Sequence, residues 1–427
     1  MENIENKIPN GENQDTQNSS FFSENVSSSN GLEAKFPLLR FRKFSHPWKQ
    51  EKLSNFTSRI MRKNSNNETE LPLTISSKDG LVDQVTFFNK KVSSKDMSGY
   101  YLLKNGEFAY NKSYSNGYDF GSIKRLERYE MGALSTLYIC FSLKKHCSDY
   151  IKHYFDSLKW YRQIYVISAE GARNHGLLNV PTDDFFATTH YLSPYMEEQQ
   201  KIANFLSLVD QRIEKQRQLV ESLKKYKRGL FLKLYNDSDK SIMLFKNIYK
   251  VASEGGTPST LDTENYKNGK LPFIKIDDLN QHYLTSAKYF ITEKGLKKSS
   301  AWLVPENSII YSNGATIGAC SINKIPVTTK QGILGIVPKS NFSVEFLYFF
   351  FTSSLFKEKI RAITTKGTMD CAYLKDINDI KISIPDFTVQ QKISKIMVDF
   401  ENLIEYTEFS LMHLHNIKKG LLQQMFI

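Results

Sequence analysis

The chain has 427 residues, with 57 lysines and arginines against 45 acidic residues, so its formal net charge is +12. Four cysteines and the absence of any run of 18 apolar residues exclude a disulfide-stapled scaffold and a transmembrane helix, and they predict a cytoplasmic protein. The length allows two or three domains, and the excess of positive charge favours a polyanionic partner.

Residues 1–34 differ from the rest of the chain. They contain six acidic residues and a single lysine, hence a net charge of −5, and many Asn and Ser residues. Such a segment cannot bury enough apolar surface to fold, and it lacks the apolar core of a signal peptide. We therefore predict a disordered acidic tail, which leaves a net charge of +17 on the remaining chain.

Two segments of the chain repeat each other. Residues 199–235 and 390–426 align without a gap at an offset of 191, and ten of the 37 positions are identical, including a shared QQKI start. Average composition would give roughly two identities. The chain is therefore predicted to consist of two halves, each a globular segment followed by a long helix.

Both repeated segments carry apolar residues at alternating steps of four and three, the pattern of a coiled-coil seam. Polar residues interrupt both seams at equivalent places, Gln216/Thr407 and Lys227/Lys418. We predict an antiparallel pair of helices, each roughly 60 Å long at 1.5 Å per residue; the alternative is two amphipathic helices that each lie on their own domain. The predicted seam consists of Ile202, Leu206, Val209, Ile213, Val220, Leu223, Leu230, Leu234, Ile393, Met397, Phe400, Ile404, Leu411, Leu414, Leu421 and Met425.

The two remaining segments show strand and turn patterns with short helices between them, which indicates an α+β fold. Strands are predicted at 165–167, 309–311 and 332–337, and helices at 147–160 and 344–359. The predicted organisation is a tail (1–34), a first globular domain (35–195), a central helix (196–240), a second globular domain (241–386) and a C-terminal helix (387–427).

Motifs for catalysis are missing from the sequence. It contains no G-x-x-x-x-G-K-[ST] phosphate loop and no Asn/Asp-Pro-Pro-aromatic tetrapeptide of a DNA amino-methyltransferase, and its His and Cys residues match no common zinc spacing. A self-sufficient DNA methyltransferase or nuclease is therefore disfavoured. A coiled-coil adaptor without a role in nucleic-acid binding stays open as a second alternative.

Polar, glycine-containing loops with nearby lysines and arginines are the most suggestive feature of the globular segments. Side chains of these types contact phosphates and base edges in DNA, although ordinary turns between strands would also contain them. In a body of charge +17, DNA contact is the better interpretation. The candidate DNA-binding residues are Gly256, Thr257, Ser259, Lys275, Asn313, Thr316, Lys330, Gln331, Lys366 and Thr368 in the second segment, and Asn111, Lys112, Lys124, Arg125, Arg173 and Asn174 in the first.

Four stretches of the sequence resemble a known protein family. The stretches EEQQKIANFLSLVDQRIE (197–214), SEGGTPSTLDTENY (253–266), VTTKQGILGIVPK (327–339) and KGTMDCAYLKDINDIKISIPDFTVQQKI (366–393) are similar to the DNA specificity subunit of type I restriction–modification systems. The resemblance covers about residues 35–427 and is stronger in the second half.

The resemblance implies two target recognition domains in pseudo-twofold repeat, separated by two long antiparallel coiled-coil helices. Each domain would read one half of a bipartite, asymmetric site in double-stranded DNA, and the helices would set the gap and dock two methyltransferase subunits, which restriction subunits then join. The chain would carry no catalytic residue, metal or cofactor of its own. S-adenosylmethionine, ATP and Mg²⁺ would be bound by the partner subunits.

Overall fold

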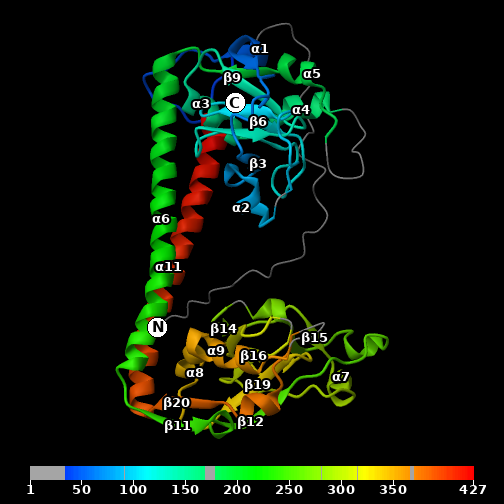
Figure 1. The fold of residues 1–427 in the computed structure, drawn as a ribbon, viewed down its shortest axis with the longest axis vertical. Coiled ribbons are helices and arrows are strands. Elements are labelled where there is room, and N and C mark those ends of the chain that lie inside the picture. The colour runs from blue at the N-terminus through cyan, green and yellow to red at the C-terminus, as the bar shows by residue number, and fades with distance from the viewer. Residues whose placement is uncertain (1–33, 91, 169–177, 280, 315, 366–369) are drawn as a thin grey trace, which may run out of the picture. The chain divides into compact units, whose positions relative to one another are not determined.

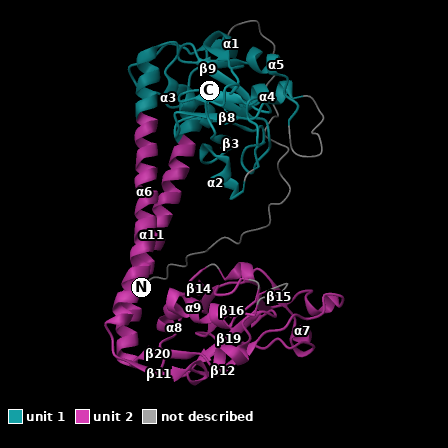
Figure 2. Ribbon diagram, in the orientation of Figure 1, with its two compact units in different colours: residues 1–204, 421–427 teal, residues 205–420 magenta. Residues whose placement is uncertain are grey.

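The computed structural model describes residues 34–427 except 91, 169–177, 280, 315 and 366–369 (Figure 1). Its contacts divide the chain into two compact units (Figure 2): unit 1 comprises residues 1–204 and 421–427, and unit 2 comprises residues 205–420. Both units contain helices and strands, which confirms the prediction of a mixed fold. Among the described residues, no helix is long and apolar enough to cross a membrane.

Unit 1 contains a four-stranded antiparallel sheet in the order β2-β9-β6-β7, a second sheet in the order β4-β3-β8-β5, and the isolated pair β1-β10. In the second sheet, β3 and β8 are parallel and the other pairs are antiparallel. The elements are β1 (Lys49–Lys52), α1 (Leu53–Phe56), β2 (Thr57–Arg59), β3 (Pro72–Ser76), β4 (Gly80–Asp83), α2 (Gln84–Phe88), β5 (Tyr101–Lys104), β6 (Phe108–Asn111), β7 (Ser122–Arg125), β8 (Met131–Leu134), β9 (Ile139–Leu143), α3 (Ser148–Asp156), α4 (Tyr161–Ile167), α5 (Thr182–Ala187), β10 (Thr189–Leu192) and the start of α6 (Met196–Asn236).

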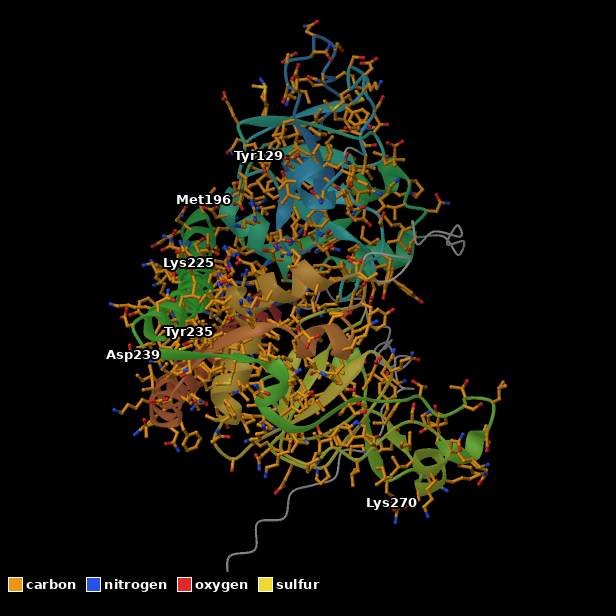
Figure 3. The ribbon with its side chains drawn as sticks, turned by 60° about the horizontal axis from the view of Figure 1, so that its bottom comes forward. Tyr129, Met196, Lys225, Tyr235, Asp239 and Lys270 are labelled. Atoms are coloured by element: carbon orange, nitrogen blue, oxygen red, sulfur yellow. The ribbon has the colours of Figure 1, made fainter. Side chains whose placement is uncertain are left out.

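Unit 2 contains a five-stranded sheet in the order β12-β19-β16-β17-β14, a three-stranded sheet in the order β15-β13-β18, and the pair β11-β20. In Figure 3, Tyr235 lies near the end of α6, and Asp239 lies in the short turn between that helix and β11. The elements are β11 (Lys240–Leu244), η1 (Phe245–Asn247), β12 (Tyr249–Glu254), η2 (Thr263–Asn265), β13 (Leu271–Ile274), η3 (Ile276–Asp278), β14 (Tyr283–Leu284), β15 (Phe290–Ile291), α7 (Glu293–Lys297), β16 (Ile309–Ser312), β17 (Cys320–Asn323), β18 (Thr328–Thr329), β19 (Ile333–Pro338), α8 (Val344–Thr352), α9 (Ser354–Ile363), α10 (Leu374–Asn378), β20 (Lys381–Pro385) and α11 (Phe387–Met425).

The two units share a strand order. The antiparallel series β2-β9-β6-β7 of unit 1 has its counterpart in β12-β19-β16-β17 of unit 2. The parallel pair β3-β8 corresponds to β13-β18, and the antiparallel pair β1-β10, which precedes α6, corresponds to β11-β20, which precedes α11. The same order of pairing therefore occurs twice along the chain.

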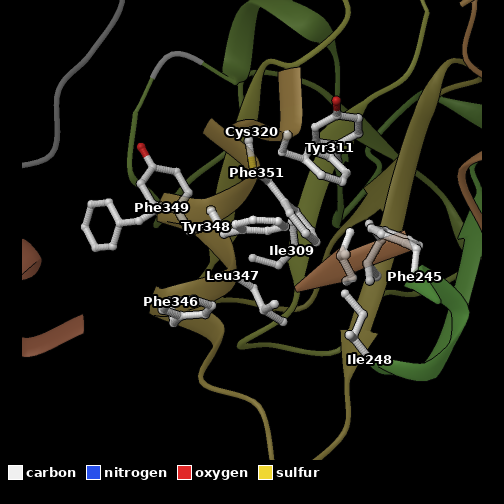
Figure 4. Close-up of a cluster of buried hydrophobic side chains, with 14 of the residues drawn as sticks. Phe245, Ile248, Ile309, Tyr311, Cys320, Phe346, Leu347, Tyr348, Phe349 and Phe351 are labelled. Atoms are coloured by element: carbon white, nitrogen blue, oxygen red, sulfur yellow. The ribbon is translucent and has the colours of Figure 1, made fainter. Parts of the chain in front are cut away.

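Aromatic side chains fill the core of each unit. In unit 1, Phe108 and Phe141 stack with ring centroids 5.5 Å apart, and Phe155 packs edge-on against both. In unit 2, the apolar helix α8 buries six consecutive residues, 346–351, in the cluster shown in Figure 4. A helix that is apolar on all sides is stable only when it is buried, so α8 lies inside unit 2.

Two local predictions need correction. Residues 165–167 form the end of helix α4 and not a strand, because the segment packs Ile164 into the core while Tyr165 and Val166 stay exposed. Tertiary packing overrides the strand preference of this short run. The single helix predicted over 344–359 is broken at Ser353, whose extended backbone (ψ 160°) ends α8 and starts α9.

The long helices α6 and α11 pair within unit 2, and their contacts run antiparallel as predicted. Lys418 pairs with Asp210 at 2.6 Å, and Lys227 pairs with Glu401. Under the repeat offset of 191, Asp210 is equivalent to Glu401 and Lys227 is equivalent to Lys418. The two ion pairs are therefore equivalent to each other. Gln216 donates from Nε2 to the carbonyl of Thr407 at 3.1 Å, and these two residues are equivalent to each other under the same offset.

These polar contacts between α6 and α11 explain the polar interruptions of the seam. Partly exposed ion pairs contribute little stability, typically about 0–1 kcal/mol each, whereas polar seam positions fix register and orientation. All sixteen apolar residues of the predicted seam are buried or half-buried. The interruptions therefore specify the antiparallel register, and the apolar seam residues supply the buried surface.

The first glutamine of each QQKI sequence forms a buried clamp at the start of its long helix. Gln199 donates from Nε2 to the carbonyl of Ser193 at 2.7 Å, and its Oε1 accepts from the backbone N–H of Cys147 at 2.8 Å. Gln390 makes the equivalent bonds, to the carbonyl of Pro385 at 2.8 Å and from the N–H of Ser343 at 2.9 Å. Both glutamines are about 1% exposed. Each clamp ties three elements together: the end of a strand, the first turn of a long helix, and the N-cap of α3 or α8.

The other end of each helix also packs into a unit in an equivalent way. Tyr235 of α6 stacks on Phe350 of α8 within unit 2, with ring centroids 5.7 Å apart. Phe426, which is Tyr235 plus the offset of 191, packs against Tyr154 of α3 within unit 1 at 5.8 Å. Unit 1 thus contains the start of α6 and the chain's last residues, and unit 2 contains the end of α6 and the start of α11.

We predict that replacing Gln390 by leucine destabilises unit 2. The change leaves the half-buried Ser343 N–H and the buried Pro385 carbonyl without these partners, at about 1–3 kcal/mol each, so the expected loss in free energy of unfolding is about 2–6 kcal/mol. Urea denaturation of the full chain measures it. Gln391→Leu, one residue along and exposed, is the matched control and should change stability by less than about 0.5 kcal/mol. Equal losses in the two variants would contradict the clamp.

A buried histidine makes the stability of unit 1 depend on pH. His190 is 3% exposed, and its ring nitrogens bond the Tyr154 hydroxyl at 2.8 Å and the Thr188 hydroxyl at 2.9 Å. Burial lowers the pKa of His190 to about 3. The folded chain therefore keeps this ring neutral where the unfolded chain, with a histidine pKa of about 6.5, binds a proton. The contribution of His190 to the free energy of unfolding is therefore fully present above pH 6.5, and it is lost as the pH falls from there towards 3.

We expect the free energy of unfolding to be about 1.4 kcal/mol lower at pH 5.5 than at pH 7.5 through His190 alone. His190→Gln should remove this part of the pH dependence in urea titrations at the two pH values. His415→Gln, on an exposed position of α11, is the control and should keep the wild-type difference. Burial and the nearby Lys227 and Lys324 lower the pKa of His282 to about 4. This histidine therefore adds the same pH dependence of stability to every variant. An unchanged difference in His190→Gln would refute the assignment.

Candidate nucleic-acid interface

The predicted DNA-binding loops of unit 2 converge, and the loop after β12 packs against the turn between β18 and β19. The Glu254 carboxylate accepts from the backbone N–H of Gly332 at 2.6 Å, and the Gly255 N–H donates to the carbonyl of Ile333 at 3.0 Å. A Cβ on Gly255 would lie 1.9 Å from the carbonyl oxygen of Thr329. Only glycine allows this approach, which packs the start of the loop after β12 against the turn that contains Lys330 and Gln331.

Two further segments join the same cluster. Asn313 donates its backbone N–H to the Gly332 carbonyl at 3.1 Å, and its side-chain Nδ2 donates to the carbonyl of Ala372 at 3.1 Å. Lys330 donates its backbone N–H to the carbonyl of Ile274 at 3.2 Å, which places Lys275 beside this turn. The structure therefore gathers segments that are as much as about 115 residues apart in the sequence.

The clustered residues differ in what they can offer to DNA. Thr257, Ser259, Thr316 and Gln331 are exposed, whereas Lys330 and Lys275 are half-buried. The Lys275 ammonium lies 3.4 Å from the ring centroid of Tyr289, a cation–π contact.

Two of the candidates have internal roles in the structure. Asn313 has no exposed surface, and its amide holds the loop to Ala372. Gly256 is buried, and a Cβ there would lie 2.1 Å from the Ser300 hydroxyl. The need for glycine at this position is therefore steric. Contact of these two residues with DNA stays a prediction.

The candidates of unit 1 are partly engaged inside the unit. Lys124 pairs with Asp156 at 2.7 Å, and Arg125 pairs with Asp149 and Glu127, each at 2.6 Å. These pairs connect β7 to α3, and the two carboxylates raise the pKa of Arg125 against the effect of burial. The positive charge of Lys124 and Arg125 is thus largely balanced within the unit.

The remaining candidates of unit 1 lie at the end of β6. Asn111 accepts from the backbone N–H of Ser113 at 3.0 Å, which forms a tight turn. Lys112 is half-buried, and desolvation lowers its pKa. The four other candidates, Arg173, Asn174, Lys366 and Thr368, lie outside the described residues.

The structure adds two basic residues that sequence reasoning missed. Lys357 and Arg361, one turn apart on α9, line a cavity of about 230 Å³ next to the loop that contains Thr316. The signal was the spacing of four residues between two cations on a strongly amphipathic helix, which places them on one face. The two glutamine clamps were also missed as functional positions, although the QQKI repeat marked them.

Comparison with known proteins finds similarity to specificity subunits of type I restriction enzymes. Residues 239–412 match the family model described as "Type I restriction modification DNA specificity domain". The specificity subunit of the type I enzyme MjaIX from Methanocaldococcus jannaschii is 33% identical over 170 residues, 39% of each chain. The EcoR124I/EcoR124II specificity subunit of Escherichia coli is 29% identical over 153 residues, 35% of this chain and 38% of that one. The matched stretch thus spans about two fifths of these curated relatives.

Solved structures match over a larger part of the chain. A structure reported for complex assembly and conformational transition of a type I restriction–modification system covers 89% of this chain and 97% of its own, with a TM-score of 0.57 and 14% identity. The type I S subunit from M. genitalium covers 92% and 99%, with a TM-score of 0.50 and 16% identity. These likenesses concern the fold. The family match confirms the resemblance seen in the sequence for residues 239–412, which carry a type I restriction modification DNA specificity domain.

Proposed function

We propose that this chain is the DNA sequence-specificity subunit of a type I restriction–modification complex and reads the two halves of a bipartite, asymmetric site in double-stranded DNA. The match of residues 239–412 to the specificity domain carries this proposal. The strand order of unit 2 recurs in unit 1, which supports two reading domains in pseudo-twofold repeat. We assign the first to residues 35–195 and the second to residues 241–386.

The antiparallel helices are the proposed spacer between the two half-sites. The two ion pairs are equivalent to each other under the offset of the sequence repeat, and so are the two residues of the Gln216–Thr407 contact. Both helices therefore present equivalent surfaces to equivalent partners. We assign to these helices the docking of two methyltransferase subunits, which restriction subunits join in the cytoplasm. Catalysis and the binding of S-adenosylmethionine, ATP and Mg²⁺ belong to those partners in this proposal.

The test of the proposal is a methylation map. The chain is co-expressed with its methyltransferase subunit in a host without adenine methylation, and the genomic DNA is sequenced for modified bases. We expect one gapped motif with an adenine modified on each strand, and no motif when the methyltransferase subunit is expressed alone. A continuous motif or no motif would refute the proposal. Methylation or cleavage by the purified chain alone would instead favour a self-sufficient enzyme.

The length of the helix pair makes a second prediction. Removing residues 213–219 and 404–410, which are equivalent heptads around the Gln216–Thr407 contact, keeps both lysine–carboxylate pairs in register. Seven residues correspond to about 10 Å of helix, or about three base pairs at 3.4 Å each, so the gap in the motif should shorten by about that number.

The control for this experiment is removal of 213–219 alone, which puts the two helices out of register and should abolish assembly with the methyltransferase subunit. Size-exclusion chromatography of the complex measures assembly, and the methylation map measures the gap. An unchanged gap in an assembled complex of the double deletion would show that the helices do not set the spacing.

A further inference from the structure

A cavity in unit 2 opens beside the loop between β16 and β17. Its volume is about 230 Å³, and its lining combines two cations with a tyrosine and a glycine of the loop: Tyr311, Gly318, Lys357, Arg361 and Thr364. The two cations are exposed, and among the described residues neither forms an ion pair. Asp370 at the rim balances one of the two charges, which leaves the cavity with a net charge of +1.

A buried hydroxyl without a partner belongs to the same cavity. Tyr311 is 1% exposed, and its hydroxyl has no hydrogen-bond partner among the described residues. Figure 4 shows this oxygen pointing away from the apolar cluster on which the ring packs. Burial raises the pKa of Tyr311 above its usual range, so the group stays a donor. Buried hydroxyls are nearly always bonded, so this one indicates a missing acceptor.

Gly318 keeps the cavity open. Its φ of +96° favours glycine, and a Cβ there would lie 3.7 Å from the Lys357 Cε and 4.0 Å from the Tyr311 hydroxyl. A side chain at this position would extend into the space between the lysine and the tyrosine. Glycine at this position therefore leaves that space free of a side chain.

Unit 1 provides an internal comparison. Tyr110 occupies the position on β6 that Tyr311 occupies on β16, but its hydroxyl donates to the carbonyl of Phe120 at 2.8 Å. Tyr161 of α4 donates to the carbonyl of Gly121, the positive-φ glycine before β7, at 2.6 Å. In unit 1 the equivalent tyrosine hydroxyl is thus satisfied by the protein itself, whereas in unit 2 the Tyr311 hydroxyl has no partner among the described residues.

We propose that this cavity of unit 2 binds a phosphate group of the DNA backbone, with Lys357 and Arg361 supplying charge and the Tyr311 hydroxyl donating one hydrogen bond. The assignment rests on the proposed DNA-reading function and deepens it. A phosphate offers several acceptor oxygens, which suit the planar donor pair of an arginine and a buried hydroxyl. Such a contact fixes the position of the duplex without reading a base, and the exposed loop residues Thr316 and Gln331 would then meet base edges.

The experiment measures the affinity of the full chain, assembled with its methyltransferase subunits, for DNA over a series of salt concentrations. Each phosphate contact contributes about 0.9 to the slope of log K against log salt. Lys357→Gln should therefore lower that slope by about 0.9, while Lys359→Gln, on the same helix but outside the cavity, should leave it unchanged. Tyr311→Phe should weaken binding several-fold without lowering the melting temperature of the free chain, because the hydroxyl has no partner among the described residues.

Equal slopes for Lys357→Gln and Lys359→Gln would overturn the assignment to backbone phosphate. The melting temperature of the chain is also measured with and without inorganic phosphate at constant ionic strength. This measurement distinguishes a free phosphate compound from the DNA backbone as the ligand. A rise that Lys357→Gln abolishes, combined with equal DNA slopes, would assign the cavity to a free phosphate compound instead. If the wild-type complex binds no DNA, the proposed function fails. Binding of phosphate in the cavity is then supported by the rise in melting temperature, and it is rejected if no rise occurs.

Discussion

A buried glutamine at the first turn of each long helix is the constraint on which the rest of the structure depends. Gln199 and Gln390 each satisfy one strand carbonyl and one helix N-cap that would otherwise be buried without partners. Leaving such groups unsatisfied is costly, so the direction of the helix is fixed relative to the sheet and helix that precede it. Because both halves use the same bonds, each long helix leaves its own globular part in the same local geometry.

That shared geometry makes the symmetric helix pairing possible. The Lys227–Glu401 and Lys418–Asp210 pairs are exchanged by the offset of 191, and the Gln216–Thr407 contact lies midway between them. Two copies of one sequence pattern can satisfy each other in this way only when they run antiparallel and meet at equivalent residues. The polar seam positions thus select one register, which a purely apolar seam would leave less well defined.

The globular parts keep their strand order but differ where a ligand would be met. Tyr110 and Tyr311 stand at equivalent strand positions. The first bonds a backbone carbonyl, whereas the second, beside Lys357 and Arg361, has no partner in the part of the chain that the structure describes. Likewise, Lys124 and Arg125 are held in ion pairs in unit 1, whereas the loops of unit 2 present Thr257, Thr316 and Gln331 at the surface. The proposed reading of an asymmetric site would require this combination of a common framework and divergent loops.

The sequence by itself determined the repeat, the two long helices and their antiparallel seam, because these features rest on periodicity and on local composition. Its motifs also carried the resemblance that the match at residues 239–412 supports. It failed at residues 165–167, where packing of Ile164 overrides strand preference. Only the tertiary structure decided which loops meet, that Asn313 is buried, and that Lys357 lies beside Tyr311, since these contacts join residues far apart in the chain. Periodicity is a property of neighbouring residues and can be read along the chain, whereas burial and the convergence of loops depend on how distant segments pack.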